Sequence, residues 1–136
     1  MIYGIGTDIV EIERVKDAAL KWGDRFLKKI FTDNELQYCY KKKNPFPHLA
    51  ARFAAKESFI KALSPGNAHS AEALYEGPLS LKDIEVLNHA DGKPYINPAG
   101  DLLSSSLRSR LIVIHLTMTH ERSHAAATVI LERNPS

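Results

Sequence analysis

The sequence predicts an α+β fold in which an antiparallel sheet packs against helices. One strand-like segment opens the chain, helical patterns then run to about residue 63, and strand-like segments with one inserted helix follow. Strands and helices that alternated regularly would favour a parallel sheet, whereas separate runs of each favour antiparallel pairing. The 136 residues suit a sizeable core, so a single domain over residues 1–136 is expected.

The first half of the chain supplies the opening strand, expected over residues 2–7, and most of the helices. Asp8 and Glu11 have the spacing of a capping box, which predicts a helix that begins at Asp8. Thr32 and Glu35 have the same spacing before another helical pattern. The helices are expected over residues 8–22, 24–30, 32–42 and 48–63.

The second half supplies the remaining strands. Residues 67–80 are small and polar and are expected to form a loop, and Asp91-Gly92 is a hairpin signal. Residues 98–109 have a proline at the start of a short helical pattern. The strands are expected over residues 83–88, 93–97, 111–119 and 125–132.

Composition excludes several classes of protein. An apolar fraction of 44% and a charged fraction of 25% are typical of a globular protein. No apolar run approaches the roughly 18 residues of a membrane span, and the first residues lack the features of a signal peptide. Cys39 is the single cysteine and is expected to pack as a small hydrophobic residue. A cytoplasmic protein without a membrane partner is therefore expected.

A basic stretch follows the first strand. Its cations are Arg14, Lys16, Lys21, Arg25, Lys28 and Lys29, opposed by Asp17 and Asp24. One interpretation is a solvated helix face. The other is a docking surface for an acidic partner, because a local positive field accelerates encounter with one.

The helix expected over residues 48–63 carries charges beside its apolar side. Glu57 and Lys61 lie one turn apart, and Arg52 and Lys56, also one turn apart, flank the other edge. A Glu–Lys pair at this spacing adds only about 0.2–0.5 kcal/mol, which is too little to account for the placement. A site for a phosphate-like anion accounts for it better, because Arg binds such oxygens in a bidentate way and Lys supplies a point charge.

Asp8 and Glu57 are candidate magnesium ligands. Mg²⁺ prefers oxygen ligands and completes its shell with water and substrate phosphates, so carboxylates from two separate segments suit it. Asp8 is also a candidate helix cap, and the two roles can coexist. His120, taken alone, is typical of a structural or solvated histidine. No zinc pattern, phosphate-binding loop or dinucleotide fingerprint occurs.

Five motifs follow one another along the chain. They are Gly4-Ile5-Gly6-Thr7-Asp8-Ile9-Val10-Glu11-Ile12, Phe53-Ala54-Ala55-Lys56-Glu57-Ser58, Asp83-Ile84-Glu85-Val86, Gly92-Lys93-Pro94 and Thr119-His120-Glu121. In this order, and over nearly the whole chain, they resemble the holo-acyl-carrier-protein synthases of the 4′-phosphopantetheinyl transferase superfamily.

The resemblance implies the fold of that superfamily and Mg²⁺-dependent transfer of phosphopantetheine from coenzyme A to a serine of an apo acyl carrier protein, with release of 3′,5′-ADP. It implies that Mg²⁺ sits on Asp8, Glu57 and the coenzyme A pyrophosphate. The serine proton would pass to Glu57 or to a water held by a carboxylate such as Glu35, and Lys61 would stabilise charge on the transferring phosphate. Further contacts to coenzyme A are expected from Arg52, Lys56, Lys93 and His120.

The same resemblance implies partners for the chain. It implies a homotrimer with active sites between subunits and a role in fatty-acid biosynthesis, while the carrier protein that is served stays open. The carrier would face the basic stretch through Arg14, Lys21, Arg25 and Lys28.

The chain departs from the usual family pattern at four places. Ser58, Thr119 and His124 stand where alanine, serine and tyrosine are usual, and residues 64–79 form a longer stretch than in compact members.

Two other functions compete with the transferase. A metal-dependent nuclease would use Asp8, Glu11 and Glu13 with the basic helices, although these three acids do not share one helix face. A non-catalytic module would bind an acidic protein through residues 14–29 without Mg²⁺ or coenzyme A. The transferase interpretation predicts no nucleic-acid partner.

Overall fold

The main sheet has three antiparallel strands in the order β1–β5–β4, and a separate antiparallel hairpin joins β2 and β3. The computed structural model describes residues 1–64, 74–75 and 77–134. The strands are β1 (Ile2–Glu11), β2 (Ile84–Asn88), β3 (Pro94–Pro98), β4 (Ile112–His120) and β5 (His124–Arg133). The helices are α1 (Ile12–Trp22), α2 (Asp24–Ile30), α3 (Asp33–Tyr40), α4 (Phe46–Leu63) and α5 (Asp101–Ser109), with a short 3₁₀ turn η1 (Leu81–Asp83). The predicted α+β class with antiparallel pairing is confirmed.

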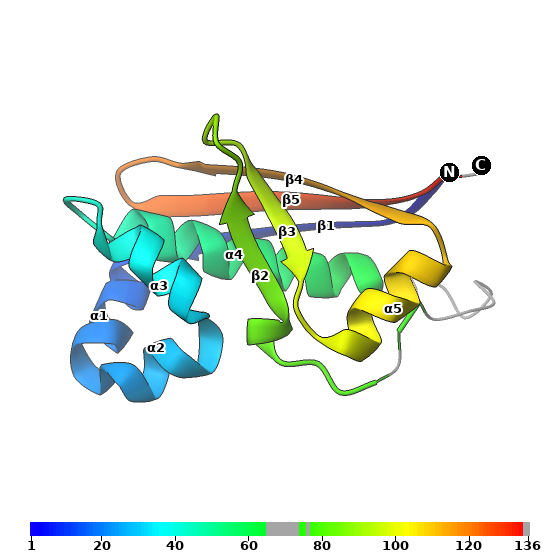
Figure 1. Cartoon of the computed structure of the whole chain (residues 1–136). Coiled ribbons are helices and arrows are strands. Elements are labelled where there is room, and N and C mark those ends of the chain that lie inside the picture. Colours follow the sequence, from blue (N-terminus) through cyan, green and yellow to red (C-terminus); the bar gives the residue numbers. More distant parts are fainter. Residues whose placement is uncertain (65–73, 76, 135–136) are drawn as a thin grey trace.

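The long helix α4 packs against one face of the main sheet (Figure 1). Two glycines of β1 allow the close contact. A Cβ at Gly4 would lie 1.9 Å from the carbonyl oxygen of Ala62, and a Cβ at Gly6 would lie 1.9 Å from that of Ser58. The strand therefore rests directly on the main chain of the helix at these two positions, because glycine has no side chain to hold them apart.

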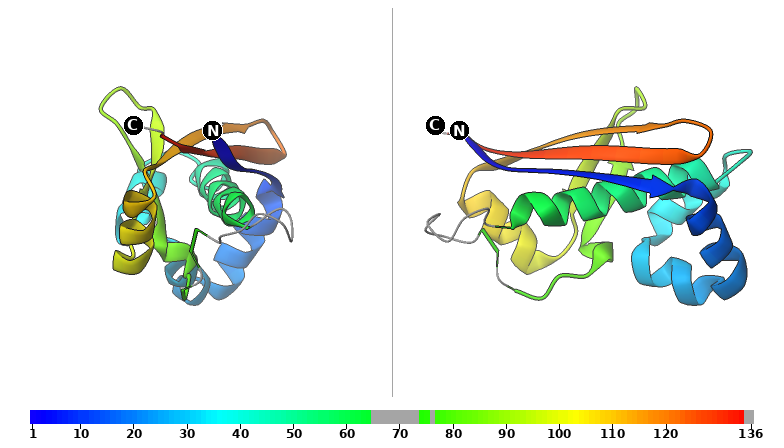
Figure 2. Two further views of the ribbon diagram at one scale, coloured as in Figure 1. Left: turned by 90° about the vertical axis from the view of Figure 1, so that its right-hand side faces the viewer. Right: turned by 180° about the vertical axis from the view of Figure 1, so that it is seen from behind.

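The apolar core has two parts along α4. Near the C-terminal end of α4, Phe59 is fully buried among residues of β2, β3, β5 and α5. Near its N-terminal end, Leu49 is fully buried among residues of α1, α2 and α3. Figure 2 shows these three helices gathered at one end of the sheet, with α5 toward the other end. Because α4 lies between these groups, residues on its different sides meet different neighbours.

The opposite face of the main sheet carries no helix among the described residues (Figure 2). Ile5 is 58% exposed and Ile9 is 68% exposed on this face, and their cross-strand partners are Ile130 and Ala126. An exposed apolar patch of this kind is typical of an interaction surface.

The predicted start of the first helix is wrong. The strand β1 continues to Glu11, the helix α1 begins at Ile12, and Glu11 makes no capping hydrogen bond through its side chain. Asp8 is therefore a strand residue, paired with Ala127 of β5, and it is not a helix cap. The physical reason is that β5 supplies ladder partners for β1 as far as His124, and this pairing outweighs the local helical pattern.

Other local predictions are confirmed. Thr32 and Glu35 form the capping box that starts α3. Cys39 is buried, and burial raises the pKa of its thiol to about 11, so it is not a thiolate at neutral pH. Most of the loop expected over residues 67–80 lies outside the described residues. Across the described ranges, no helix is both long and apolar enough to span a bilayer.

Candidate functional site

A cavity of about 520 Å³ lies where β1, α1, α2 and α4 meet. Part of its wall is apolar, from Phe26 and Phe53 among others, and part is charged. The charged and polar residues of its lining are Asp8, Glu11, Arg14, Glu57 and His124. Two predicted magnesium ligands and one predicted carrier-binding cation thus share a single cavity, although they come from three different elements.

Asp8 and Lys61 form a pair beside this cavity. The Lys61 ammonium donates to the carbonyl oxygen of Thr7 at 2.9 Å and to Asp8 Oδ1 at 3.2 Å. The Lys61 side chain is 55% exposed and that of Asp8 is 21% exposed. An ammonium has three N–H donors, and no third acceptor lies within reach of Lys61 among the described residues. Lys61 therefore keeps one donor for a ligand.

The carboxylates of the cavity fit Mg²⁺ and do not fit a closed metal site. Asp8 comes from β1 and Glu57 from α4, and both line the cavity. In the part of the chain that the structure describes, no three His, Cys, Asp or Glu residues are arranged to hold a metal together. Two carboxylates alone suit an ion that keeps water and takes phosphate oxygens. The triad of Asp8, Glu11 and Glu13 that a nuclease would need is not formed.

The predicted carrier-binding cations divide between the cavity and the surface. Arg14 lines the cavity wall. Lys21 and Arg25 lie over the exposed Trp22 ring, 4.9 Å and 5.9 Å from its centroid. Lys28 is exposed and only 3.7 Å from Asp24, a surface pair of little energetic weight. The basic stretch is therefore an exposed surface that continues from the cavity along α1 and α2.

The structure corrects the predicted contact between Lys56 and coenzyme A. Its ammonium is fully buried and donates to Glu35 Oε1 at 2.8 Å and to the carbonyl oxygens of Leu81 at 2.9 Å and Ile84 at 2.8 Å. All three donors are used inside the protein, so Lys56 joins α4 to α3 and β2 and has none left for a ligand. Burial lowers the pKa of Lys56, and the Glu35 carboxylate opposes that shift.

The structure also corrects the prediction that Glu35 could bind a water that accepts the serine proton. Its side chain is fully buried, and its oxygens accept from Lys56, from the backbone N–H of Thr32 and from that of Val86. Its carboxylate is not among the groups that line the cavity. Of the two proton acceptors considered from the sequence, only Glu57 lies at the cavity.

A second group of polar side chains, made up of Arg52, His48 and His120, lies on the other side of α4. Arg52 is 2% exposed, donates to Asn88 Oδ1 at 2.6 Å and lies 4.3 Å over the Tyr38 ring. Its Nε is the buried side-chain nitrogen that has no partner among the described residues. The His48 ring meets the His120 ring edge-on, with centroids 5.6 Å apart. Burial is the main cause that lowers the pKa of His48, followed by His120 and Arg52.

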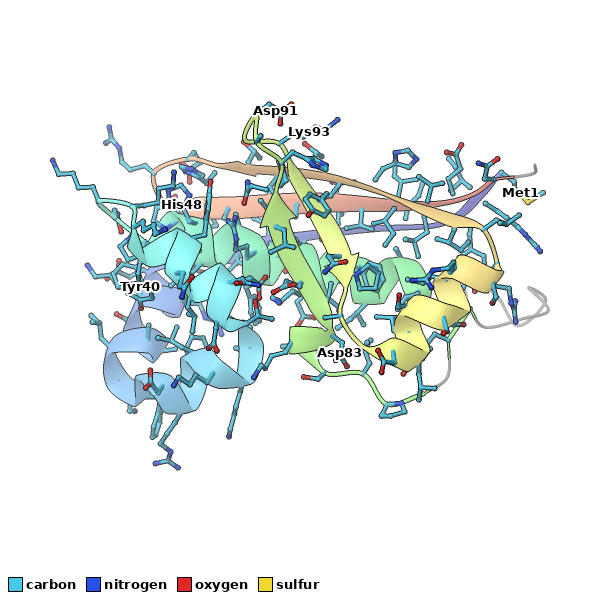
Figure 3. The ribbon with its side chains drawn as sticks, in the orientation of Figure 1. Met1, Tyr40, His48, Asp83, Asp91 and Lys93 are labelled. Carbon is cyan, nitrogen blue, oxygen red and sulfur yellow. The ribbon has the colours of Figure 1, made fainter. Side chains whose placement is uncertain are left out.

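Lys93 joins neither group. Figure 3 shows it beside Asp91 at the tip of the β2–β3 hairpin, apart from His48. Its backbone N–H donates to Asp91 Oδ1 at 2.9 Å, and its side chain is exposed. The structure therefore gives Lys93 a turn position without a contact to Arg52 or His120.

The cavity and the second polar group lie at opposite edges of the main sheet. The cavity adjoins β1, which is one edge strand, while His120 ends β4, which is the other. The helix α4 separates them, because Phe53 and Glu57 line the cavity whereas Arg52 contacts Asn88 of β2.

Some residues of the site were missed from the sequence. Phe26 and Phe53 of the cavity wall were predicted only as helix residues, and their amphipathic spacing does not separate a cavity wall from a core. His124 was noted only as a departure from a family pattern. His124 lies at a strand end, opposite Glu11. This position could have identified it, but only once the strand register was known.

Comparison with known proteins gives consistent matches. The model of the 4′-phosphopantetheinyl transferase superfamily matches residues 4–129. A holo-acyl-carrier-protein synthase of Halothermothrix orenii is 44% identical over 132 residues, which cover 97% of this chain and 98% of the relative. The crystal structure of the Neisseria meningitidis holo-acyl-carrier-protein synthase superposes with a TM-score of 0.81 at 36% identity and covers 98% of this chain and 100% of that one. A Bacillus anthracis synthase in complex with coenzyme A (3′,5′-ADP) superposes with a TM-score of 0.73 at 32% identity, with 98% and 99% covered.

Proposed function

Because this chain belongs to the 4′-phosphopantetheinyl transferase superfamily, as one of its holo-acyl-carrier-protein synthases, we propose that it is a Mg²⁺-dependent transferase that uses coenzyme A and releases 3′,5′-ADP. The acceptor is a serine of an apo acyl carrier protein. The observation that carries the proposal is the cavity in which Asp8 and Glu57 lie beside Lys61, whose ammonium keeps one free donor.

Asp8 and Glu57 would hold the Mg²⁺. When bound, the ion supplies positive charge to the pyrophosphate and orients it for displacement. The Lys61 ammonium is held by Thr7 and Asp8 and directs its remaining donor to an oxygen of the transferring phosphate. Charge stabilisation of this kind is the main contribution a protein makes to phosphoryl-type transfer.

The nucleotide end of coenzyme A would lie on Arg52 and His120 of the second polar group, contributed by a neighbouring copy. Support comes from the position of the two groups at opposite edges of the sheet, with α4 between them. It also comes from the exposed apolar sheet face around Ile5 and Ile9, which a second copy would cover. We therefore include a homotrimer with active sites between subunits in the proposal.

The carrier protein would dock on the exposed surface of α1 and α2. Arg14 in the cavity wall would meet the part of the carrier next to its serine. Acidic side chains of the carrier would be attracted to the cations further along the helices, which are Lys21, Arg25 and Lys28. This surface adjoins the cavity, so docking and transfer share one side of the molecule.

The test is to mix the protein with coenzyme A, Mg²⁺ and an apo carrier protein and to weigh the carrier. A gain equal to one phosphopantetheine arm, lost when Mg²⁺ is chelated, is the expected result. Asp8→Asn and Glu57→Gln should each lose most activity while remaining folded, whereas Asp101→Asn, at an exposed acid on α5 away from the cavity and the docking surface, should behave as wild type. A carrier that gains no mass under any condition would overturn the transferase.

A further inference from the structure

Trp22 is the last residue of α1, and it is 49% exposed. Single exposed apolar residues are ordinary on protein surfaces, so exposure alone assigns no role to it. The surroundings of Trp22 are less ordinary, because the Lys21 ammonium lies 4.9 Å and the Arg25 guanidinium 5.9 Å from the centroid of its ring. The function proposed above uses these two cations and gives no role to the ring that they share.

The helical register places Trp22 on the side of α1 that faces the cavity. Arg14 and Ala18 of this helix line the cavity. With 3.6 residues per turn, Trp22 lies only about 40° from Ala18 around the helix axis and about 6 Å further along it. The Cα–Cβ bond of a helical residue tilts toward the N-terminus, which for Trp22 is the direction of Ala18. Trp22 is therefore at the rim of the cavity and not on the far side of the helix.

The corner between α1 and α2 brings a second cation to the ring (Figure 1). Gly23 has a φ of +55°, which suits a residue without a Cβ. Its carbonyl oxygen accepts the backbone N–H of Phe26 at 3.1 Å and thereby starts α2. The corner consequently sets Arg25 over Trp22 on the outside, while Phe26 forms part of the cavity wall.

We propose that Trp22 is the apolar anchor of the carrier-docking surface, and that it selects carriers in which an apolar side chain lies between acidic ones. In the complex, Lys21 and Arg25 pair with carboxylates of the carrier, and the indole packs against the apolar side chain. Trp and Arg are over-represented among the few residues that dominate binding at interfaces. The inference rests on the proposed function and names the partner chemistry that its docking surface recognises.

Charge and position both favour an acidic carrier as the occupant. The exposed charged side chains of residues 20–29 are four cations and one acid, namely Lys21, Arg25, Lys28 and Lys29 against Asp24. A second copy of the chain, docked by the same patch, would bring like charges together. The patch also adjoins the cavity that the acceptor serine has to reach. A carrier that docks here presents its serine to Asp8 and Glu57.

Covering of the ring by its own cations is the competing explanation. Cation–π contacts at exposed positions are weak, and both cations also remain accessible to solvent. Their contacts leave about half of Trp22 open, which is the part available to a partner. Simple covering predicts that no partner changes the environment of the indole.

The first experiment measures the emission of Trp22, which is the single tryptophan of the chain. An apo acyl carrier protein without tryptophan is titrated into the wild-type protein, with coenzyme A and Mg²⁺ left out so that no transfer occurs. We expect the emission maximum to move to shorter wavelength as the indole leaves water. Added salt should weaken the shift, because it screens the cations. Vesicles of anionic phospholipid should leave the maximum unchanged.

The second experiment measures the KM for the carrier and kcat in variants of α1. Trp22→Ala should raise this KM about 10-fold and leave kcat within about two-fold of wild type, because docking contacts are the same before and during the reaction. Trp22→Phe should recover part of the loss. Leu20→Ala is the matched control, since Leu20 is an exposed apolar residue of the same helix, about 160° from Trp22 around the axis. Its KM should stay within about two-fold of wild type.

Several results would overturn the inference while leaving the transferase intact. One is an emission maximum that does not respond to a carrier that the wild-type protein modifies. Another is a KM in Trp22→Ala equal to that of wild type or matched by Leu20→Ala. A shift caused by the vesicles and not by the carrier would assign Trp22 to a membrane surface, and a shift on concentrating the protein alone would assign it to a contact between copies. If Trp22→Ala does not fold, the titration of wild type decides. A wild-type protein that transfers nothing overturns the proposed function itself.

Discussion

Lys56 and Lys61 lie on the same helix, five positions apart, and have opposite environments. Lys56 is fully buried, pairs with the fully buried Glu35 and gives all three donors to protein oxygens. Lys61 is half exposed, pairs with Asp8 at the cavity and keeps one donor. From the sequence, both were assigned to coenzyme A.

Both lysines carry the same charge, so charge does not distinguish a structural lysine from a ligand-binding one. The number of N–H donors left unused by the protein does. A lysine with every donor satisfied in the core connects elements of the fold, whereas a lysine with a free donor next to a cavity is available to a ligand. Each of the following predictions tests one side of this comparison.

The largest effect is expected on the buried side. Lys56→Met leaves Glu35 buried without its cation, which typically costs about 3–5 kcal/mol of unfolding free energy. Urea denaturation followed by circular dichroism measures this loss. Lys61→Met, the matched change at the cavity, should lose less than about 1 kcal/mol. Equal losses of unfolding free energy in Lys56→Met and Lys61→Met would contradict the assignment of Lys56 to the fold and Lys61 to the ligand.

The next effect is on the rate of transfer. Lys61→Met removes a donor to the transferring phosphate, so we expect kcat to fall about 100-fold. The carrier mass assay under saturating coenzyme A gives this value. Lys56→Met, assayed at a temperature where it remains folded, should keep a kcat within a few-fold of wild type. A larger fall in Lys56→Met than in Lys61→Met would reassign Lys56 to the reaction.

A smaller effect is expected when both members of the buried pair are replaced. Lys56→Met with Glu35→Leu removes both charges at once, and such exchanges are often neutral or stabilising. The backbone N–H groups of Thr32 and Val86 lose their acceptor in this variant, which offsets part of the recovery. We expect unfolding free energy within about 1–2 kcal/mol of wild type, measured by the same denaturation. A double variant no more stable than Lys56→Met alone would show that the contacts to Leu81 and Ile84 dominate.

The smallest effect concerns His48, on the buried side of the same helix. Its pKa is lowered from 6.5 in the folded chain, first by burial and then by His120 and Arg52. The unfolded chain therefore binds a proton near pH 6.5 that the folded chain resists, so stability falls as pH drops below 6.5. Denaturation midpoints at pH 7.5 and pH 5.5 should differ less in His48→Gln than in wild type. If the denaturation midpoints of both proteins depend on pH in the same way, His48 does not contribute to the loss of stability at low pH.

The fold was largely predictable because periodicity and turn signals are local. The capping box at Thr32 and the hairpin at Asp91-Gly92 both lie where the sequence predicted them. The start of α1 was not predictable, because Asp8 and Glu11 satisfy a capping pattern that only the register with β5 overrides.

The candidate site was predictable in part for a related reason. Asp8 and Glu57 were proposed together, and the structure brings both to one cavity. The spacing of Arg52, Lys56, Glu57 and Lys61 gives their relation around one helix, yet it does not reveal which neighbours each side meets. The burial of Lys56 depends on Glu35 and on carbonyls of Leu81 and Ile84, which lie far along the chain.

The contact of Gly4 and Gly6 with α4 has a consequence for how the sequence can diverge. At these two positions strand and helix touch main chain to main chain, so no side chain lies between them there to change their spacing. The separation of Asp8 from Glu57 and Lys61 is therefore insulated from substitutions elsewhere in the core. Exchanges around Phe59 or Leu49 can accumulate without moving these groups relative to one another. A protein engineer who keeps the two glycines could therefore make volume-conserving exchanges in both parts of the core with little expected movement of these groups.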